Sequence, residues 1–449
     1  MSPEIVSILV LILIFVVTTT LSINMGLLAF GAAFLVGTLA GGLTADDIFA
    51  GFPGDLFIVL VGVTYLFGIA QVNGTIDWLV DLAVRGVRGR LVVIPWIMFI
   101  VAAVLTAVGA ASPAAVAIVA PIALGFAAQY NISPMLMGLL VVHGAQAGGF
   151  SPISIYGVIV NGLVNRSDLP SGEIVLFLGS LVLNLALGLV VFFVFGGARL
   201  LSAGRVSTSQ GSVHDGDEPE GREGPSGGEA EGDRVQEGGQ LQEGDDREDS
   251  SPAWQRWLTV AGVFAVIALS LGFTLDVGLV AITVAAVLAL AMPGLQGEAV
   301  GRVSWSVVLL ICGVLTYVAV LEEIGTIEYV GEAITRVGAP LLAALLLCYI
   351  GAIVSAFASS TGLLALTIPL AVPFLQEGTL GAVGVITAIA ISSTVVDASP
   401  LSTNGALVLA NAVNVDKEAL FRKLLLYGAV VVVVSAPLTW LIFVATGLF

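Results

Sequence analysis

Four breaks that carry hydroxyl groups fall deep inside apolar segments of this chain. They are Ser112-Pro113, Ser151-Pro152, Ser359-Ser360-Thr361 and Ser399-Pro400. In three of them Ser precedes Pro, a signal for a helix start, because the Ser oxygen caps free N–H groups and Pro lacks one. A helix start carries about half a positive charge and offers N–H donors to an anion. We therefore expect each break to begin a half-helix that is buried or faces a wet cavity. Ser133-Pro134, by contrast, is expected to start an ordinary helix at a membrane edge.

The segments around these breaks contain no basic side chain. Residues 91–165 and 339–415 lack Lys and Arg. The charge of a bound anion must then be met by helix ends, hydroxyls, amides and cations. Carbonyls freed at each break, together with hydroxyls, form oxygen sites of the kind that Na⁺ accepts, so we expect a cation and an anion to bind together.

Two ionisable side chains lie well inside the apolar segments. Asp397 comes two residues before Ser399. A carboxylate at that depth is expensive and usually functional, and it could ligate a cation, carry a proton or cap the half-helix. His143 is a second possible proton site, and a hydrogen-bonded structural histidine is its competing interpretation. Weaker polar candidates are Gln146, Asn161, Thr394, Thr403 and Asn404.

The composition indicates a membrane protein. Hydrophobic residues make up 58% of the 449 residues and charged residues 10%, whereas soluble domains have about 25% charged residues. Stretches of about 20 apolar residues predict transmembrane helices. The net charge of −17 comes mostly from residues 207–251, which hold 14 acidic residues against 3 Arg. We expect residues 203–253 to form a disordered acidic linker on the cytoplasmic side.

The chain repeats itself at a spacing of about 250 residues. The run Ser151–Gly157 returns as Ser399–Gly405 at a spacing of 248, and Gly62 meets Gly313 at a spacing of 251. We therefore predict two repeats, residues 1–200 and 254–449. Each holds a re-entrant hairpin (91–129 and 339–376) and a helix broken at the midplane (135–165 and 380–412).

The expected fold is an all-α membrane protein with about ten transmembrane helices and two hairpins. Five crossings per repeat place the two repeats in opposite orientations, which makes the repeat inverted. Positive charges are expected on the cytoplasmic side, and with the N-terminus outside they divide 13 to 2 in favour of that side. The expected location is the inner (plasma) membrane. Two full crossings in place of each hairpin leave this count unchanged.

At these residues the chain resembles the ion-transporter superfamily, especially its divalent anion–sodium symporters. The strongest resemblance is to MatC-type dicarboxylate (malonate) carriers over residues 1–165. Each hairpin of that group has a Ser-Asn-Thr tip ten residues before a Pro. Counting back from Pro369 gives Ser359-Ser360-Thr361, and counting back from Pro121 gives Ala111-Ser112-Pro113. Ser151-Pro152 and Ser399-Pro400 match the second signature of the group, a Thr-Pro or Ser-Pro break.

The resemblance implies an elevator-type, homodimeric carrier that moves dicarboxylates, such as malonate, succinate or malate, or citrate, with Na⁺. No other cofactor and no nucleic acid is implied. The substrate would lie against Ser112, Pro113, Ser151, Pro152, Ser360, Thr361, Ser399 and Pro400. The two Na⁺ sites would involve Ala111, Ser112, Gly149, Phe150, Ser359, Ser360, Asp397 and Ala398.

Other functions remain open at this point. Asp397 and His143 favour a proton-coupled carrier, a cation/proton antiporter or a metalloid-anion exporter of the same superfamily. A passive channel is disfavoured by the paired hairpins. An intramembrane hydrolase would need a paired nucleophile and base or a metal-binding motif. The chain has two His in all and no such pairing, so we do not expect an enzyme.

Overall fold

The computed structural model describes residues 2–21, 23–85, 91–202, 252–273, 275–330, 340–356, 360–376, 378 and 380–447. All regular structure within these ranges is helical. The predicted acidic linker and Ser359 lie outside the described residues, apart from 252 and 253 at the end of the linker.

The two halves of the chain contain helices in the same order. The first half holds α1 (Pro3–Thr20), α2 (Met25–Leu39), α3 (Ala45–Ala50), α4 (Gly54–Val72), α5 (Thr75–Arg85), η1 (Leu91–Val93), α6 (Ile94–Ala107), α7 (Ser112–Gln129), α8 (Pro134–Gly148), α9 (Ile155–Arg166), α10 (Glu173–Val194) and α11 (Gly197–Ser202). The second half holds α12 (Ala253–Phe273), α13 (Val277–Ala291), η2 (Pro293–Leu295), α14 (Gln296–Gly301), α15 (Trp305–Glu323), α17 (Pro340–Ser355), α18 (Ser360–Gln376), α19 (Ala382–Val395), α20 (Thr403–Ala410), α21 (Lys417–Trp440) and η3 (Leu441–Ala445).

Local capping shows why several of these helices begin where they do. Asn24 caps α2 through a bond from Gly26 N (2.9 Å), and Asp276, 252 residues later, caps α13 through a bond from Leu279 N (2.8 Å). Short helix α3, which sequence patterns did not predict, starts with a capping box between Thr44 and Asp47. The bond from the Thr44 hydroxyl holds the pKa of Asp47 below its usual value.

Many of the described helices are long and apolar enough to lie in a bilayer. Six of them could span it by length and composition, or seven if the bent pair Val277–Ala291 and Pro293–Gly301 is one span. The shorter apolar helices include α1, α2, α17, α18 and α19. The prediction of an all-helical membrane protein is therefore confirmed.

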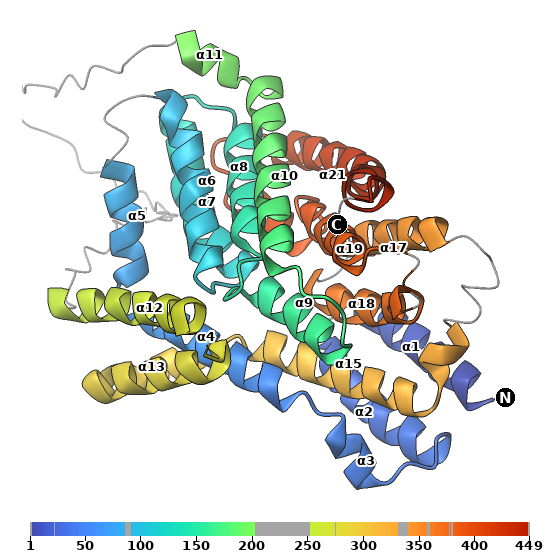
Figure 1. The fold of residues 1–449 in the computed structure, drawn as a ribbon. Helices are drawn as coiled ribbons and strands as arrows, with labels where there is room; N and C mark the ends of the chain where they lie inside the picture. The colour runs from blue at the N-terminus through green and yellow to red at the C-terminus, as the bar shows by residue number, and fades with distance from the viewer. Residues whose placement is uncertain are drawn as a thin grey trace, which may run out of the picture.

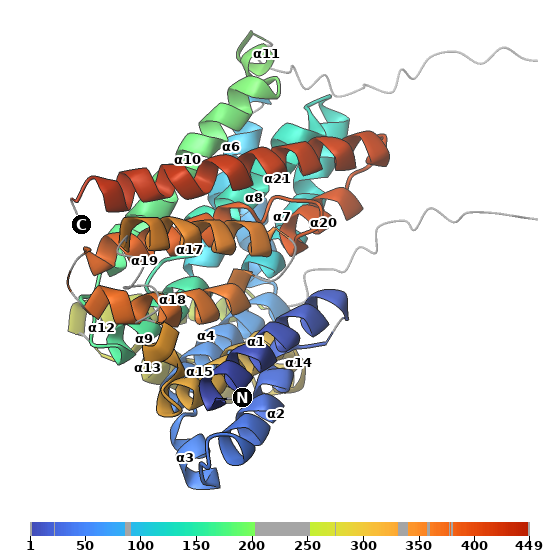
Figure 2. The same cartoon turned by 90° about the vertical axis from the view of Figure 1, so that its right-hand side faces the viewer.

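The helices form two layers, which both views show (Figures 1 and 2). One layer contains α1 to α4 and α12 to α15, the first helices of each half. The other contains α6 to α10 and α17 to α21, with the hairpins and broken helices. Helices α9 and α18 lie where the two layers meet (Figure 1). Each layer thus combines equivalent parts of both halves.

Two glycine crossings join the halves within the first layer. At the crossing of α2 and α15, a Cβ added to Gly26 would lie 2.0 Å from Leu309 O, and one added to Gly313 would lie 2.0 Å from Gly26 O. At the crossing of α13 and α4, a Cβ on Gly278 would lie 2.5 Å from a Val59 methyl carbon. Small residues permit such close approach of membrane helices. The crossings explain why these glycines recur at matching positions in the two halves.

Candidate functional site

The two helix breaks have the same loop, built around a serine at the same position. Ser154 donates through Oγ to the carbonyls of Gly149 (2.5 Å) and Ser151 (2.7 Å) between α8 and α9. Ser402 donates to the carbonyls of Asp397 (2.7 Å) and Ser399 (2.7 Å) between α19 and α20. Both serines are buried, so these bonds satisfy backbone carbonyls that each break frees.

The half-helices start later than the Ser-Pro pairs predict. Helix α9 begins at Ile155 with Ser154 as its N-cap, whose oxygen accepts from Gly157 N (3.3 Å). The prediction that Ser151 is a cap is wrong, because its hydroxyl donates instead to Ala107 O (2.5 Å) at the end of α6. This bond joins the first break to the first hairpin.

The second break departs from the prediction in the same way. Helix α20 begins at Thr403, and Ser402 rather than Ser399 occupies its N-cap position. Ser399 Oγ accepts from Leu401 N (3.3 Å), inside the turn. Glycine is required just beyond each cap, since a Cβ on Gly157 or on Gly405 would lie 1.9 Å from the carbonyl oxygen of Ser151 or Ser399.

The hairpin tips begin helices at the predicted serines, although these serines do not act as caps. Helix α7 starts at Ser112, and its N-cap residue Ala111 makes no side-chain capping bond. Gly109 precedes it with a φ of +120°, a conformation that glycine adopts readily. In the second hairpin, Ser360 Oγ lies 2.7 Å from Ser355 Oγ, which joins the two arms across the tip.

Each hairpin contacts the broken helix of the opposite half. Ser112 in α7 accepts a hydrogen bond from Asn404 Nδ2 in α20 (2.7 Å). The residues at equivalent positions 248 residues away are Ser360 and Tyr156. Tyr156 of α9 lies near Ser360 and Thr361 of α18, and also near Ser112. The two hairpins and two broken helices therefore make one reciprocal set of contacts.

A cavity of about 280 Å³ opens beside the first hairpin tip and these hydroxyls. Of the predicted site residues, those that line it are Ala111, Ser112, Pro113, Gly149 and Thr361. Tyr156, Ser304 and Ser306 complete its polar wall. No charged residue lines it among the residues that the structure describes. Ser151, Pro152, Ser360, Ser399 and Pro400 do not contribute to its lining, and Pro152 instead lines a second cavity near Asp55.

Asp397 contacts the same Asn404 side chain that donates to Ser112. Its Oδ2 accepts from Asn404 Nδ2 (2.9 Å) and from Gln146 Nε2 (3.2 Å). All three side chains are buried. The neighbouring predicted residues Phe150 and Ala398 are fully buried as well, and the Phe150 ring packs against Tyr156 with centroids 5.5 Å apart.

His143 lies in a separate polar contact. Its Nδ1 is 2.9 Å from Asn184 Oδ1 in α10, and its Nε2 is 2.5 Å from the Tyr427 hydroxyl in α21. Both ring nitrogens are thus engaged between helices, as expected for a histidine with a structural role. The structure does not bring His143 into contact with Asp397, and its role as a proton site stays a prediction.

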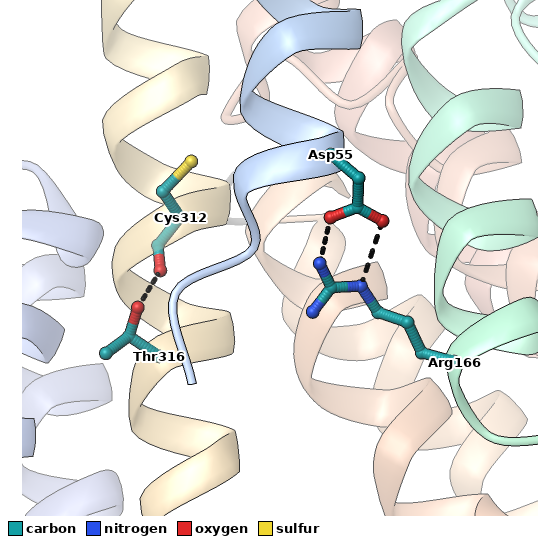
Figure 3. A network of polar contacts seen from close by, with 4 residues as sticks. All are labelled: Asp55, Arg166, Cys312 and Thr316. Atoms are coloured by element: carbon teal, nitrogen blue, oxygen red, sulfur yellow. Dashed lines mark hydrogen bonds and ion pairs between the residues drawn. The ribbon is translucent and has the colours of Figure 1, made fainter. Parts of the chain in front are cut away.

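An ion pair connects the two layers near the end of α9. Arg166 at the C-terminus of α9 bonds through Nη2 and Nε to both carboxylate oxygens of Asp55 in the first turn of α4 (Figure 3). On the neighbouring α15, the Thr316 hydroxyl donates to Cys312 O (2.7 Å) within its own helix (Figure 3). Arg166 lines two cavities, one of about 440 Å³ and one of about 840 Å³.

Tyr156 is the main site residue that sequence reasoning missed. Its phenol ring is in an apolar run and carries no polar signal of its own. Alignment of the two halves gives the only signal, because it places Tyr156 opposite Asn404. Gln146 and Asn404 were weak candidates one by one, and the structure joins both to Asp397.

Comparisons with known proteins agree with a transporter fold. Residues 1–149 match the sequence model of a family described as "Dicarboxylate carrier protein MatC N-terminus". The crystal structure of the Alcanivorax borkumensis YdaH transporter has a TM-score of 0.58, 14% sequence identity, and coverage of 98% of this chain and 98% of that one. A search of curated proteins finds no match.

These findings define the fold and one region of similarity. The chain shares the fold of that transporter, and its first 149 residues are similar to the MatC N-terminal family. The predicted resemblance to MatC-type carriers is confirmed over residues 1–149, the part that matches that family.

Proposed function

We propose that this chain is a secondary active transporter of dicarboxylates, driven by Na⁺. The family to which residues 1–149 are similar supports the substrate class. The observation that carries the proposal is the cavity at the first hairpin tip, which is lined by hydroxyls and by the start of α7, with no charged side chain among the lining residues that the structure describes. Helix starts and hydroxyls can bind carboxylate groups, and the missing positive charge favours a cation bound with them.

Small carboxylates of three or four carbons suit this site in size. The cavity of about 280 Å³ lies just below the usual range of small-molecule sites, which measure about 300–1,000 Å³. Malonate, succinate or malate are the proposed substrates, and citrate is a larger candidate. The Ser112 and Tyr156 hydroxyls would orient the carboxylate groups.

The proposed mechanism is alternating access of the elevator type. The hairpins and broken helices form one layer, and the glycine crossings tie the other layer together. We propose that the first of these layers moves against the second within a homodimer. Reciprocal contacts between equivalent parts of the two halves support a two-fold relation, and five crossings per half would make it an inverted one.

The identity of the coupling ion is the part of this proposal for which an alternative exists. A proton-coupled carrier, a Na⁺/H⁺ antiporter or a metalloid-anion exporter would also use a buried carboxylate, and Asp397 is one. Purified protein in proteoliposomes would separate these functions. We expect uptake of labelled malonate or succinate under an inward Na⁺ gradient, and no uptake under a proton gradient alone. Uptake driven only by protons would contradict Na⁺ coupling, and an absence of uptake across a carboxylate panel would refute the substrate class.

Serine variants test the location of the site. Ser112→Ala and Thr361→Ala, which remove hydroxyls from the cavity wall, should abolish uptake without loss of folded protein. Ser133→Ala is the matched control, because Ser133 caps α8 away from the breaks by accepting from Leu136 N (3.4 Å). Wild-type uptake by both site variants would refute the assignment. An equal loss in the control would show that the effect reflects helix stability instead.

A further inference from the structure

Three buried polar side chains meet between the two halves of the protein. They are Gln146 of α8, Asp397 after α19 and Asn404 of α20, with exposed fractions of 0%, 4% and 0%. Both amide groups donate to the same carboxylate oxygen, Oδ2 of Asp397, at 3.2 Å and 2.9 Å. The cluster joins segments that lie about 250 residues apart in sequence.

Two strong acceptors of this cluster have no donor. Gln146 Oε1 and Asn404 Oδ1 are buried and make no hydrogen bond to any residue that the structure describes. Leaving a buried polar atom unpaired costs about 1–3 kcal/mol. Two such oxygen atoms, on side chains that also bind a carboxylate, indicate a missing ligand that is coordinated by oxygen atoms.

The carboxylate of Asp397 also lacks a positive partner. None of the ion pairs within the described ranges includes it, and residues 91–165 and 339–415 contain no Lys or Arg. A buried charge is normally paired or coordinates a metal ion. A bound cation would supply the positive charge that this cluster lacks.

The cluster occurs in one copy only. Gln146, Asp397 and Asn404 have Thr394, Gly149 and Tyr156 at the equivalent positions of the other half. The side chains of these three residues carry neither a carboxylate nor an amide group. The symmetric loops are therefore combined with one asymmetric set of oxygen atoms.

We propose that Asp397, Gln146 and Asn404 bind one Na⁺ ion through their side-chain oxygens. The site deepens the proposed cation-coupled transport on which it rests. A monovalent ion balances the single carboxylate, whereas a divalent ion would leave a net buried charge. Each amide turns its oxygen toward the ion by rotation about its last side-chain bond, a change that exchanges its donor and acceptor ends.

This rotation connects the ion to the substrate cavity. Asn404 Nδ2 also donates to Ser112 Oγ, and Ser112 lines the cavity. When the amide oxygen of Asn404 turns to the ion, the nitrogen leaves Ser112, and its hydroxyl becomes free to bind a carboxylate. Binding of either ligand then favours the other by the same factor.

Thermal unfolding of the purified protein without any dicarboxylate tests the site directly. We expect NaCl, but not KCl or choline chloride at equal ionic strength, to raise the unfolding midpoint of the wild type. Asp397→Asn should abolish this rise and, because it removes an unbalanced buried charge, should unfold no earlier than the wild type in Na⁺-free buffer. Gln146→Met should raise the half-saturating Na⁺ concentration about tenfold or more. Glu323→Gln removes an exposed carboxylate at the end of α15 and serves as the matched control.

The outcomes separate this site from the proposed transport activity. A Na⁺-dependent rise in Asp397→Asn equal to that of the wild type would refute the site, even if dicarboxylate uptake is Na⁺-driven. A midpoint that responds to pH and not to Na⁺ in the wild type would also refute it, in favour of a proton. If Na⁺ binding is lost in Asp397→Asn and no carboxylate is transported by the wild type, the site stands and the substrate class fails.

Discussion

The crossing of α2 and α15 gives a sharp test of how the two halves fit together. Gly26 and Gly313 face each other, and an added Cβ on either would lie 2.0 Å from a backbone oxygen. Ordinary contact begins near 3.4 Å, so an alanine must push the helix backbones apart by about 1.4 Å. Overpacking of this kind costs about 1–3 kcal/mol, which exceeds the gain of about 1 kcal/mol in helix propensity from Gly to Ala.

We therefore expect Gly26→Ala and Gly313→Ala to destabilise the protein by up to about 2 kcal/mol. The measurement is thermal unfolding in detergent, followed as the folded fraction by size-exclusion chromatography. Gly31→Ala is the matched control in the same helix, since no atom lies within 4 Å of its added Cβ. This control should be neutral or up to about 1 kcal/mol more stable.

The opposite result would refute the packing argument. If Gly26→Ala or Gly313→Ala unfolds at the same temperature as Gly31→Ala, the helices are not in contact at this crossing. The equivalent crossing of α4 and α13 extends the test. A Cβ on Gly62 would lie 2.8 Å from Ile282 N, so Gly62→Ala should also destabilise the protein, by less than Gly313→Ala.

Three further predictions follow from the site and its loops. In a double-mutant cycle, Asp55→Asn and Arg166→Gln should show a coupling of less than about 1 kcal/mol in unfolding, since the side chains are 57% and 38% exposed. A coupling above that would show that the ion pair is more shielded than the structure indicates. Ser154→Ala should lower stability by about 1–2 kcal/mol in chemical unfolding, because it removes the N-cap and two bonds to loop carbonyls, and an unchanged midpoint would contradict that role. Tyr156→Phe should raise KM for the dicarboxylate with normal yield of folded protein, and an unchanged KM would exclude the phenol group from substrate binding.

The helix breaks were predictable because strong local signals mark them. Gly, Ser and Pro interrupt otherwise apolar runs at Ser112, Ser151, Ser360 and Ser399, and helices start at or within a few residues of each. The spacing of 248 to 252 residues predicted that the helices of the two halves would follow the same order. The paired glycines had no explanation in the sequence, since only the fold brings Gly26 to Gly313.

The register of the caps was not predictable from local patterns. Ser151-Pro152 looks like a helix start, but the carbonyl of Ala107, 44 residues earlier, takes the Ser151 hydroxyl. Ser154 then becomes the cap. The short helices α3 and α14 were missed because six residues give too little periodicity to detect. In each case a tertiary contact or a short length overrides the pattern on which the prediction depends.

The asymmetry of the polar residues has a consequence for the order of binding. The two halves keep the same loops, yet of these two loops only the second has a carboxylate, at Asp397, which is linked to the cavity residue Ser112 through Asn404. The proposed dicarboxylate substrate would bring two negative charges to a site whose surrounding segments, 91–165 and 339–415, have no Lys or Arg. At low dielectric, repulsion from Asp397 would oppose this binding until a cation neutralises the carboxylate. Under the proposed function, the cation would therefore bind before the substrate, because the ion-free protein would bind the substrate only weakly. This order would link the two fluxes without any direct contact between the ion and the transported anion.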